Sequence, residues 1–441
     1  MSRRRTGLRG YYLLEGLNAL GTNVFFLGIF FHARVGHGFS DGANLLLAAT
    51  QGAAYVLATR AGGRLADRIG PDRSIALGLA GMCLALLAGW RLPHAATLFA
   101  TIALYSASTA LTWPALEAAI ARAPGRAALA RRTGLYNVVW SFTGATGFFF
   151  SGPLFALDPD AVFLAPLAAH ALMLAGLAFA LLPFTHSAEA VARTGSNGTI
   201  APDNTARGSL CGRTERIGGV ARRGGLHRAE RSEHGGDPQR QDPGADVHAL
   251  PPGTRGSYLL SARIANGLGY FLFGAFAALA PTIGERLGLA PHLAIWLVST
   301  YLFARGGVFV LFWLWEGWEY RRCWLVAALA LPPGALAAAF LAPTAPAVIA
   351  ALAVLGATSG MAYSASLHSS LDRKGGEGEG GGFHEWVIGI GVLLGPLAGA
   401  AGAGMFGGTT GAGGLVTALG AAAALAGLAS LLRRKCGIQQ T

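Results

Sequence analysis

Two long apolar segments flank the stretch Gly63-Arg64-Leu65-Ala66-Asp67-Arg68-Ile69-Gly70-Pro71-Asp72-Arg73, which is far more polar than either of them. Its glycines permit a tight turn, because a residue without a Cβ adopts backbone conformations that other residues avoid. Its acidic and basic side chains can pair with each other, or meet the end of a neighbouring helix, where backbone dipoles leave partial charge. The stretch therefore predicts a short polar connection between two apolar helices.

The rest of the chain repeats this alternation of apolar segments and short polar connections. Of its 441 residues, 53% are hydrophobic and 13% are charged, and the mean hydropathy is +0.46. A soluble globule has too little interior for so much apolar surface, which disfavours soluble enzymes, nucleic-acid-binding proteins and secreted disulfide scaffolds. A helix needs about 20 apolar residues to cross a bilayer. We expect twelve such helices, near 11–31, 43–62, 74–91, 95–116, 133–155, 161–184, 258–282, 292–315, 323–342, 346–368, 384–403 and 411–432.

The basic residues predict how these helices are oriented. With a cytoplasmic N-terminus, the predicted inner connections hold most of the lysines and arginines, whereas the outer ones hold only Arg34, Arg91 and Arg286. Inner connections of membrane proteins carry this excess of positive charge. We therefore expect a multi-pass protein of the cell membrane with both termini in the cytoplasm.

The segment 187–256 divides the chain into two parts of similar length. It is rich in Gly, Arg, Ser and Pro, and it predicts a disordered basic cytoplasmic linker between six-helix bundles at 1–186 and 257–441. The two parts also share short sequences: Tyr105-Ser106-Ala107-Ser108 recurs as Tyr363-Ser364-Ala365-Ser366, and Gly152-Pro153-Leu154 as Gly395-Pro396-Leu397. Two related bundles with a substrate site between them are a recurrent transporter plan.

In residues and position, the stretch 63–73 resembles the signature loop of the major facilitator superfamily, although Pro71-Asp72 replaces a basic pair that is usual there. Trp113-Pro114-Ala115-Leu116-Glu117 is similar to a second acidic region of that family. The resemblance implies an all-α membrane protein with twelve helices in two pseudo-symmetric bundles. It also implies a secondary active transporter that moves a small solute across the cytoplasmic membrane by alternating access. The residues of the loop that the resemblance assigns to gating are Gly63, Asp67, Arg68, Gly70 and Arg73.

Arg305 is the first candidate for substrate binding. It stands in the middle of the segment 292–315, and an arginine at a helix centre costs about 2.5–3.5 kcal/mol even on lenient insertion scales. Such a residue is expected to face a water-filled cavity and to meet a partner. A guanidinium holds a carboxylate or phosphate in two-point contact, which favours an anionic substrate. The alternative is that the helix is misplaced and Arg305 lies at the membrane surface.

Other polar residues inside the predicted helices are candidates for the cavity or for coupling. Asn18 and Asn266 occupy matching positions in the first and seventh segments, and we expect them to line the cavity. His170 is either a cavity residue suited to a proton relay or a packing histidine.

Three carboxylates and one further arginine complete the candidates. Glu15 and Arg263 also match in position and could form an inner ion pair or extend separately to water. Glu117 and Glu385 are candidates for proton coupling, or they simply face water near the inner helix ends.

The sequence predicts neither cofactor nor metal. The four cysteines are isolated, and no G-x-x-x-x-G-K-[ST] loop for ATP is present. We expect a monomer in the lipid bilayer that binds a small molecule and no nucleic acid. The alternative functions are a non-transporting membrane sensor and a polytopic membrane enzyme. The substrate, the coupling ion and the direction of transport stay open.

Overall fold

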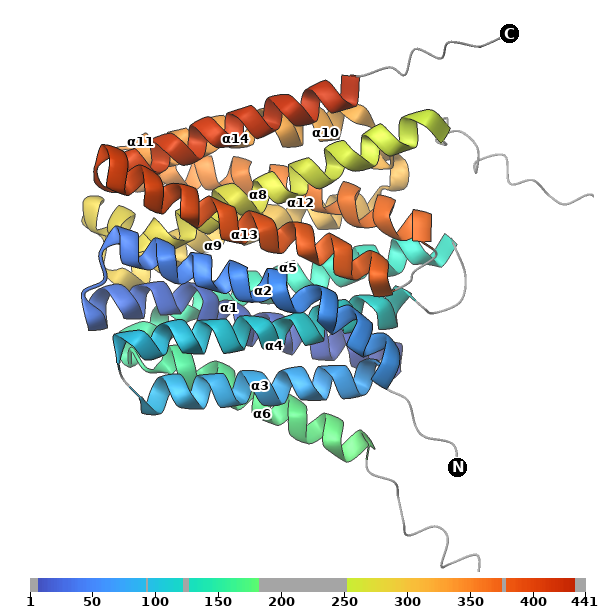
Figure 1. Cartoon of the computed structure of the whole chain (residues 1–441), viewed down its shortest axis with the longest axis horizontal. Helices are drawn as coiled ribbons and strands as arrows, with labels where there is room; N and C mark the ends of the chain where they lie inside the picture. The colour runs from blue at the N-terminus through green and yellow to red at the C-terminus, as the bar shows by residue number, and fades with distance from the viewer. Residues whose placement is uncertain (1–6, 93, 122–126, 182–251, 375–377, 433–441) are drawn as a thin grey trace, which may run out of the picture. The chain divides into compact units, whose positions relative to one another are not determined.

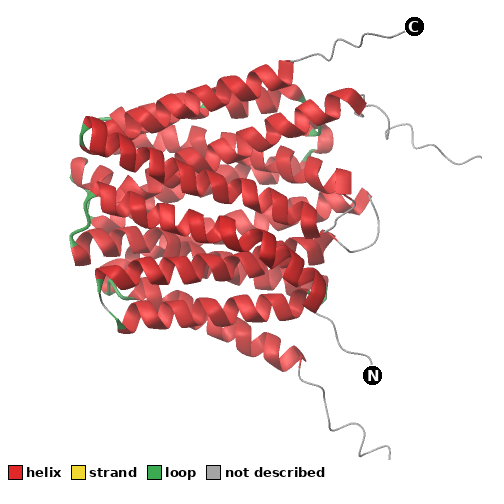
Figure 2. Ribbon diagram, viewed as in Figure 1, coloured by secondary structure: helices red, strands yellow, loops and turns green. Residues whose placement is uncertain are grey.

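The computed structural model describes residues 7–92, 94–121, 127–181, 252–374 and 378–432. Residues 187–251 of the predicted linker lie outside these ranges. All regular structure within the described residues is helical (Figure 2). The first helix set comprises α1 (Leu8–His37), α2 (Asp41–Ile69), α3 (Pro71–Arg91), α4 (Ala95–Ala121), α5 (Ala127–Leu157) and α6 (Ala161–Leu181). The second helix set comprises α8 (Pro252–Arg286), α9 (Pro291–Leu314), α10 (Arg322–Ala330), α11 (Pro332–Leu341), α12 (Ala345–Lys374), α13 (Gly378–Phe406) and α14 (Gly408–Leu432).

The helices confirm the predicted all-α membrane fold. Ten segments of the described residues are long and apolar enough to cross a membrane, and α10 and α11 together form one of them. The helices α2 and α5 are also long enough, with 29 and 31 residues, and they bring the crossings to twelve. These two are not among the ten segments, and both carry charged residues near an end, such as Arg68 in α2 and Arg131 in α5.

The polar stretch at 63–73 is mostly helical. The helix α2 continues to Ile69, Gly70 adopts a left-handed backbone with φ of 88°, and α3 begins at Pro71. Proline suits the first position of a helix because its missing N–H would have no partner there. The predicted connection is therefore a single glycine between two helices. We call this end of the bundle the Gly70 end and the opposite end, where α1 meets α2, the Gly38 end; in Figure 1 they lie at the right and at the left.

Helices of the two sets pack directly against each other. The most extensive contacts between the sets join α2 to α13 and α5 to α9. A Cβ added at Gly52 in α2 would collide with the backbone of Leu393 in α13, and one added at Gly389 would press against Val56. These glycines therefore allow the two helices to approach closely, as small residues do in membrane helix interfaces. Both sets belong to one compact unit, Met1–Leu182 with His248–Thr441.

Candidate functional site

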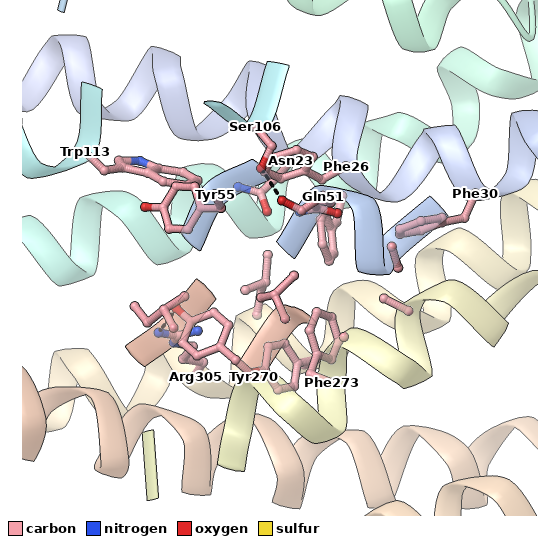
Figure 3. Close-up of a pocket in the computed structure, with 18 of the residues that line it drawn as sticks. Asn23, Phe26, Phe30, Gln51, Tyr55, Ser106, Trp113, Tyr270, Phe273 and Arg305 are labelled. Atoms are coloured by element: carbon pink, nitrogen blue, oxygen red, sulfur yellow. Dashed lines mark hydrogen bonds between the residues drawn. The ribbon is translucent and has the colours of Figure 1, made fainter. Parts of the chain in front are cut away.

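A cavity of about 120 Å³ lies between the two helix sets. Its lining comes from α1, α2, α4 and α5 on one side and from α8, α9 and α13 on the other. Figure 3 shows Asn23, Gln51 and Ser106 on the first side and Arg305 and Tyr270 on the second. The cavity therefore has a polar group on each side and is otherwise lined mainly by apolar and aromatic residues.

Aromatic rings form much of the cavity wall. Phe273 and Tyr301 stack with ring centroids 3.7 Å apart and planes 7° apart, and Phe148 stacks on Phe273 at 6.4 Å. Phe26 and Phe30 of α1 line the same cavity. The Tyr301 hydroxyl donates to Ser359 Oγ at 2.7 Å, which fixes this ring on the wall. A ligand with a flat apolar body would find ring faces to pack against.

Arg305 of α9 lines the cavity and is fully buried. Its guanidinium carbon lies 4.5 Å from the ring centre of Trp140 and 4.7 Å from that of Tyr363, so the cation is held against two aromatic faces. Its Nη2 donates to the Tyr270 hydroxyl at 2.8 Å, whereas its Nε has no hydrogen-bond partner. Arg305 makes no ion pair with a carboxylate of the described chain within 4.0 Å.

Next to Arg305, two glutamates and a histidine form a buried cluster that joins the two sets. One oxygen each of Glu117 and Glu385 and a ring nitrogen of His384 all lie within 4.8 Å of one another. Tyr363 of the second set donates to Glu117 of the first at 3.2 Å, and Tyr55 of the first set donates to Glu385 of the second at 2.5 Å. Each helix set thus supplies one tyrosine and one glutamate to a crosswise pair of hydrogen bonds.

The predicted ion pair between Glu15 and Arg263 is absent from this conformation. The carboxyl group of Glu15 is fully buried, and the side chains that interact with it are Glu385, Trp113 and Tyr136. The guanidinium of Arg263 lies over the ring of Phe383 at 4.4 Å. Glu15 therefore adds a third carboxyl group to the surroundings of the buried cluster.

The other cavity candidates lie away from the cavity lining. Asn18 and Asn266 are buried, and their side-chain amides make no hydrogen bond. His170 is fully buried and its Nε2 lies 2.7 Å from the Tyr105 hydroxyl, which also donates to Thr22. His170 is thus enclosed within the first set, and its role stays a prediction. Asn23 and Gln51, which do line the cavity, carry no sequence signal that separates them from other helix residues.

The residues assigned to gating lie at the Gly70 end. Asp67, Arg68 and Arg73 are exposed, whereas Gly63 is buried. Next to them, the Tyr11 hydroxyl of α1 donates to Asp72 at 2.9 Å and ties α1 to the start of α3. Their role in gating stays a prediction.

At the Gly38 end, charged residues connect the two sets in a way that the sequence did not indicate. Arg34 of α1 makes a two-point contact with Glu285 of α8, at 3.0 and 2.7 Å. Arg34 also lies 3.6 Å from Asp41, and the hydroxyls of Thr282 and Thr409 donate to Asp41 at 2.5 and 2.6 Å. From the sequence, Arg34 is expected only in an outer connection, because residues 251 positions apart give no signal of contact.

Comparisons with known proteins agree with this architecture. The sequence model of the Major Facilitator Superfamily matches residues 12–219. Among solved structures, the chain is similar to a bacterial homologue of the human lysosomal transporter Spinster in an inward-facing, unoccupied conformation, with a TM-score of 0.58 and 15% identity over 96% of this chain and 94% of that one. It is also similar to the nucleoside transporter NupG, with a TM-score of 0.59 and 13% identity over 96% of this chain and 98% of that one. A search of curated proteins finds no match.

Proposed function

We propose that the chain is a secondary transporter of the major facilitator superfamily, whose sequence model matches residues 12–219, and that its substrate is a small organic anion. The substrate would occupy the cavity between the two helix sets, with its anionic group at Arg305 and its apolar body against the aromatic wall. It would reach each side of the membrane in turn by alternating access. The coupling ion stays open.

The observation that carries this proposal is the environment of Arg305. A fully buried guanidinium without an ion-pair partner in the described chain carries a large desolvation cost. Aromatic faces and one tyrosine hydroxyl compensate part of that cost, and Nε keeps a free donor. A carboxylate in the cavity would supply both the missing charge and an acceptor for that donor.

The size of the cavity limits the substrate in this conformation. A dry protein cavity of about 150 Å³ holds a benzene molecule, and this cavity has a volume of about 120 Å³. A single-ring or short-chain carboxylate is therefore the expected class. A larger solute would need the two helix sets to move apart.

Thermal unfolding of the purified chain tests the charge requirement with matched ligands. Benzoate should raise the melting temperature, because a ligand that binds only the folded state stabilises it, whereas the neutral isostere benzamide should not. Arg305→Gln should abolish the benzoate shift, and Arg305→Lys should weaken binding about tenfold because an ammonium lacks the two-point geometry. Arg91→Gln, at the end of α3 and outside the cavity, is the control and should bind as the native chain does.

The thermal-unfolding measurements should also include inorganic phosphate and short aliphatic carboxylates as ligands. The proposal is wrong if every anion binds no better than its neutral counterpart, or if Arg305→Gln binds the anions unchanged. Counterflow of the bound anion into proteoliposomes then separates a transporter from a sensor, because a sensor would bind without exchange.

The membrane orientation is part of the proposal. The excess of basic residues on the Gly70 end supports a cytoplasmic position for that end and for both termini, with the Gly38 end outside. We also propose that the chain acts as a monomer, since one chain supplies both sides of the cavity.

A further inference from the structure

The cluster next to Arg305 has the composition of a metal site. Glu117, His384 and Glu385 are 96–100% buried, and they offer two carboxylate oxygens and one imidazole nitrogen within 4.8 Å of one another. Ligands at about 2.0–2.2 Å from a tetrahedral ion lie about 3.3–3.6 Å apart. The three groups therefore need to approach one another by up to about 1.5 Å to share one ion.

A hydroxyl group orients each of the three side chains. Tyr363 donates to Glu117 Oε1 and Tyr55 to Glu385 Oε2, and Ser366 Oγ lies 3.1 Å from His384 Nδ1. Metal ligands are commonly held in this way by hydrogen bonds from a surrounding layer of side chains. The arrangement leaves His384 Nε2 buried without a hydrogen-bond partner. This unpaired ring nitrogen is a second observation that points to a ligand, because native proteins rarely bury polar atoms unpaired.

A third carboxyl group lies near the cluster. Glu15 is an electrostatic neighbour of both glutamates, so three carboxyl groups share one buried region with Arg305 nearby. An imidazole with two carboxylates suits a first-row divalent ion such as Zn²⁺.

We propose that Glu117, His384 and Glu385 bind one divalent transition-metal ion that joins α4 of the first helix set to α13 of the second. This inference is independent of the substrate, because it concerns residues outside the cavity lining. An ion held there would fasten the two sets together at the Gly70 side of the cavity. It would therefore favour the conformation described above over one in which the sets separate at that side.

The test is a zinc titration of the full-length chain, freed of affinity tags and treated with a chelator. In competition with a zinc-sensitive dye, the native chain should bind one Zn²⁺, and Co²⁺ should give the visible d–d absorption of a histidine–carboxylate site. His384→Gln and Glu117→Gln should each lose the high-affinity ion and the Co²⁺ band. Ser366→Ala should weaken the affinity about 10–100-fold, because it removes only the group that orients the imidazole.

Matched controls lie on the same side of the bundle. His368 and Glu319 form a histidine–carboxylate pair at 3.7 Å outside the cluster, and His368→Gln and Glu319→Gln should leave the zinc site unchanged. Every variant is first compared with the native chain in thermal unfolding without metal, and the Ser366→Ala result stands even if His384→Gln fails to fold. Equal zinc binding by the native chain and the His384→Gln chain would overturn the proposal. So would a native chain that binds no Zn²⁺, in which case the carboxyl groups share protons instead.

Discussion

Tyr105 and Tyr363 occupy the same position in the repeated sequence Tyr-Ser-Ala-Ser, but their hydroxyl groups have different partners. Tyr105 bonds to Thr22 and His170 inside the first helix set, whereas Tyr363 bonds to Glu117 across the two sets. The repeat was visible in the sequence, and so was the cost of a buried Arg305. The division of roles between the two tyrosines was not visible, because it depends on which neighbouring helix each ring faces.

Replacing Tyr105 by Phe tests whether His170 has a packing role. The change leaves His170 buried with both ring nitrogens unpaired, since Nδ1 already lacks a partner. We expect the free energy of unfolding to fall by about 1–3 kcal/mol, measured by denaturant titration. Benzoate binding should not change, because neither residue lines the cavity.

Tyr258→Phe provides the comparison for this variant. Tyr258 is equally buried, and its hydroxyl makes no hydrogen bond within the described residues. Its loss should therefore have little effect on stability. A Tyr105→Phe chain as stable as the native one, with altered ligand binding, would instead place His170 in the transport machinery.

At the scale of elements, the contact between α2 and α13 depends on glycine. Gly52→Ala would place a Cβ against the backbone of Leu393, which cannot move away as a flexible side chain could. We expect this substitution to lower the stability by about 1–3 kcal/mol through overpacking, with a lower melting temperature in detergent. Gly176→Ala in α6 has open space around the new Cβ and should be neutral or slightly stabilising. Equal effects of the two substitutions would contradict a close contact between α2 and α13.

The helices themselves could be predicted from the sequence, and their arrangement around the site could not. Each predicted crossing overlaps an observed helix, with ends that differ by up to seven residues, because a span needs about 20 apolar residues. The stretch at 63–73 was expected to be a connection, but Gly70 alone breaks the helix and the rest continues α2 and α3. The buried cluster could not be foreseen, because Glu117 and Glu385 are far apart in the chain and meet only through the packing of the two sets.

For the molecule as a whole, contacts between the sets exist at both ends of the cavity. The pair Arg34–Glu285 at the Gly38 end is partly exposed, with side-chain exposures of 25% and 53%. Exposed pairs of this kind contribute under about 1 kcal/mol. That amount changes overall stability little, yet it can shift an equilibrium between two conformations up to about fivefold.

Reversing the charge at Arg34 should therefore change how often the cavity is accessible from the Gly38 end. We expect Arg34→Glu to raise the labelling rate of a cysteine at Ser106 by an impermeant thiol reagent about two- to fivefold, because the Gly38 end would open more often. The experiment uses intact cells and a chain whose own cysteines are replaced by serine. Adding Glu285→Arg should restore the native rate. Labelling only after the cells are permeabilised would contradict the proposed orientation, and a double variant as fast as the single one would show that the pair does not hold this end closed.

The crosswise bonds from Tyr55 to Glu385 and from Tyr363 to Glu117 have a consequence for protein engineering and for descent. In each of these hydrogen bonds the donor lies in one helix set and the acceptor in the other. Each set therefore depends on side chains of the other set to pair its tyrosine and its glutamate. A hybrid that joins the first set to the second set of another transporter would leave Glu117 and Tyr55 without their counterparts. The two sets are therefore expected to be inherited together, and new substrates to arise by change within the cavity rather than by exchange of halves.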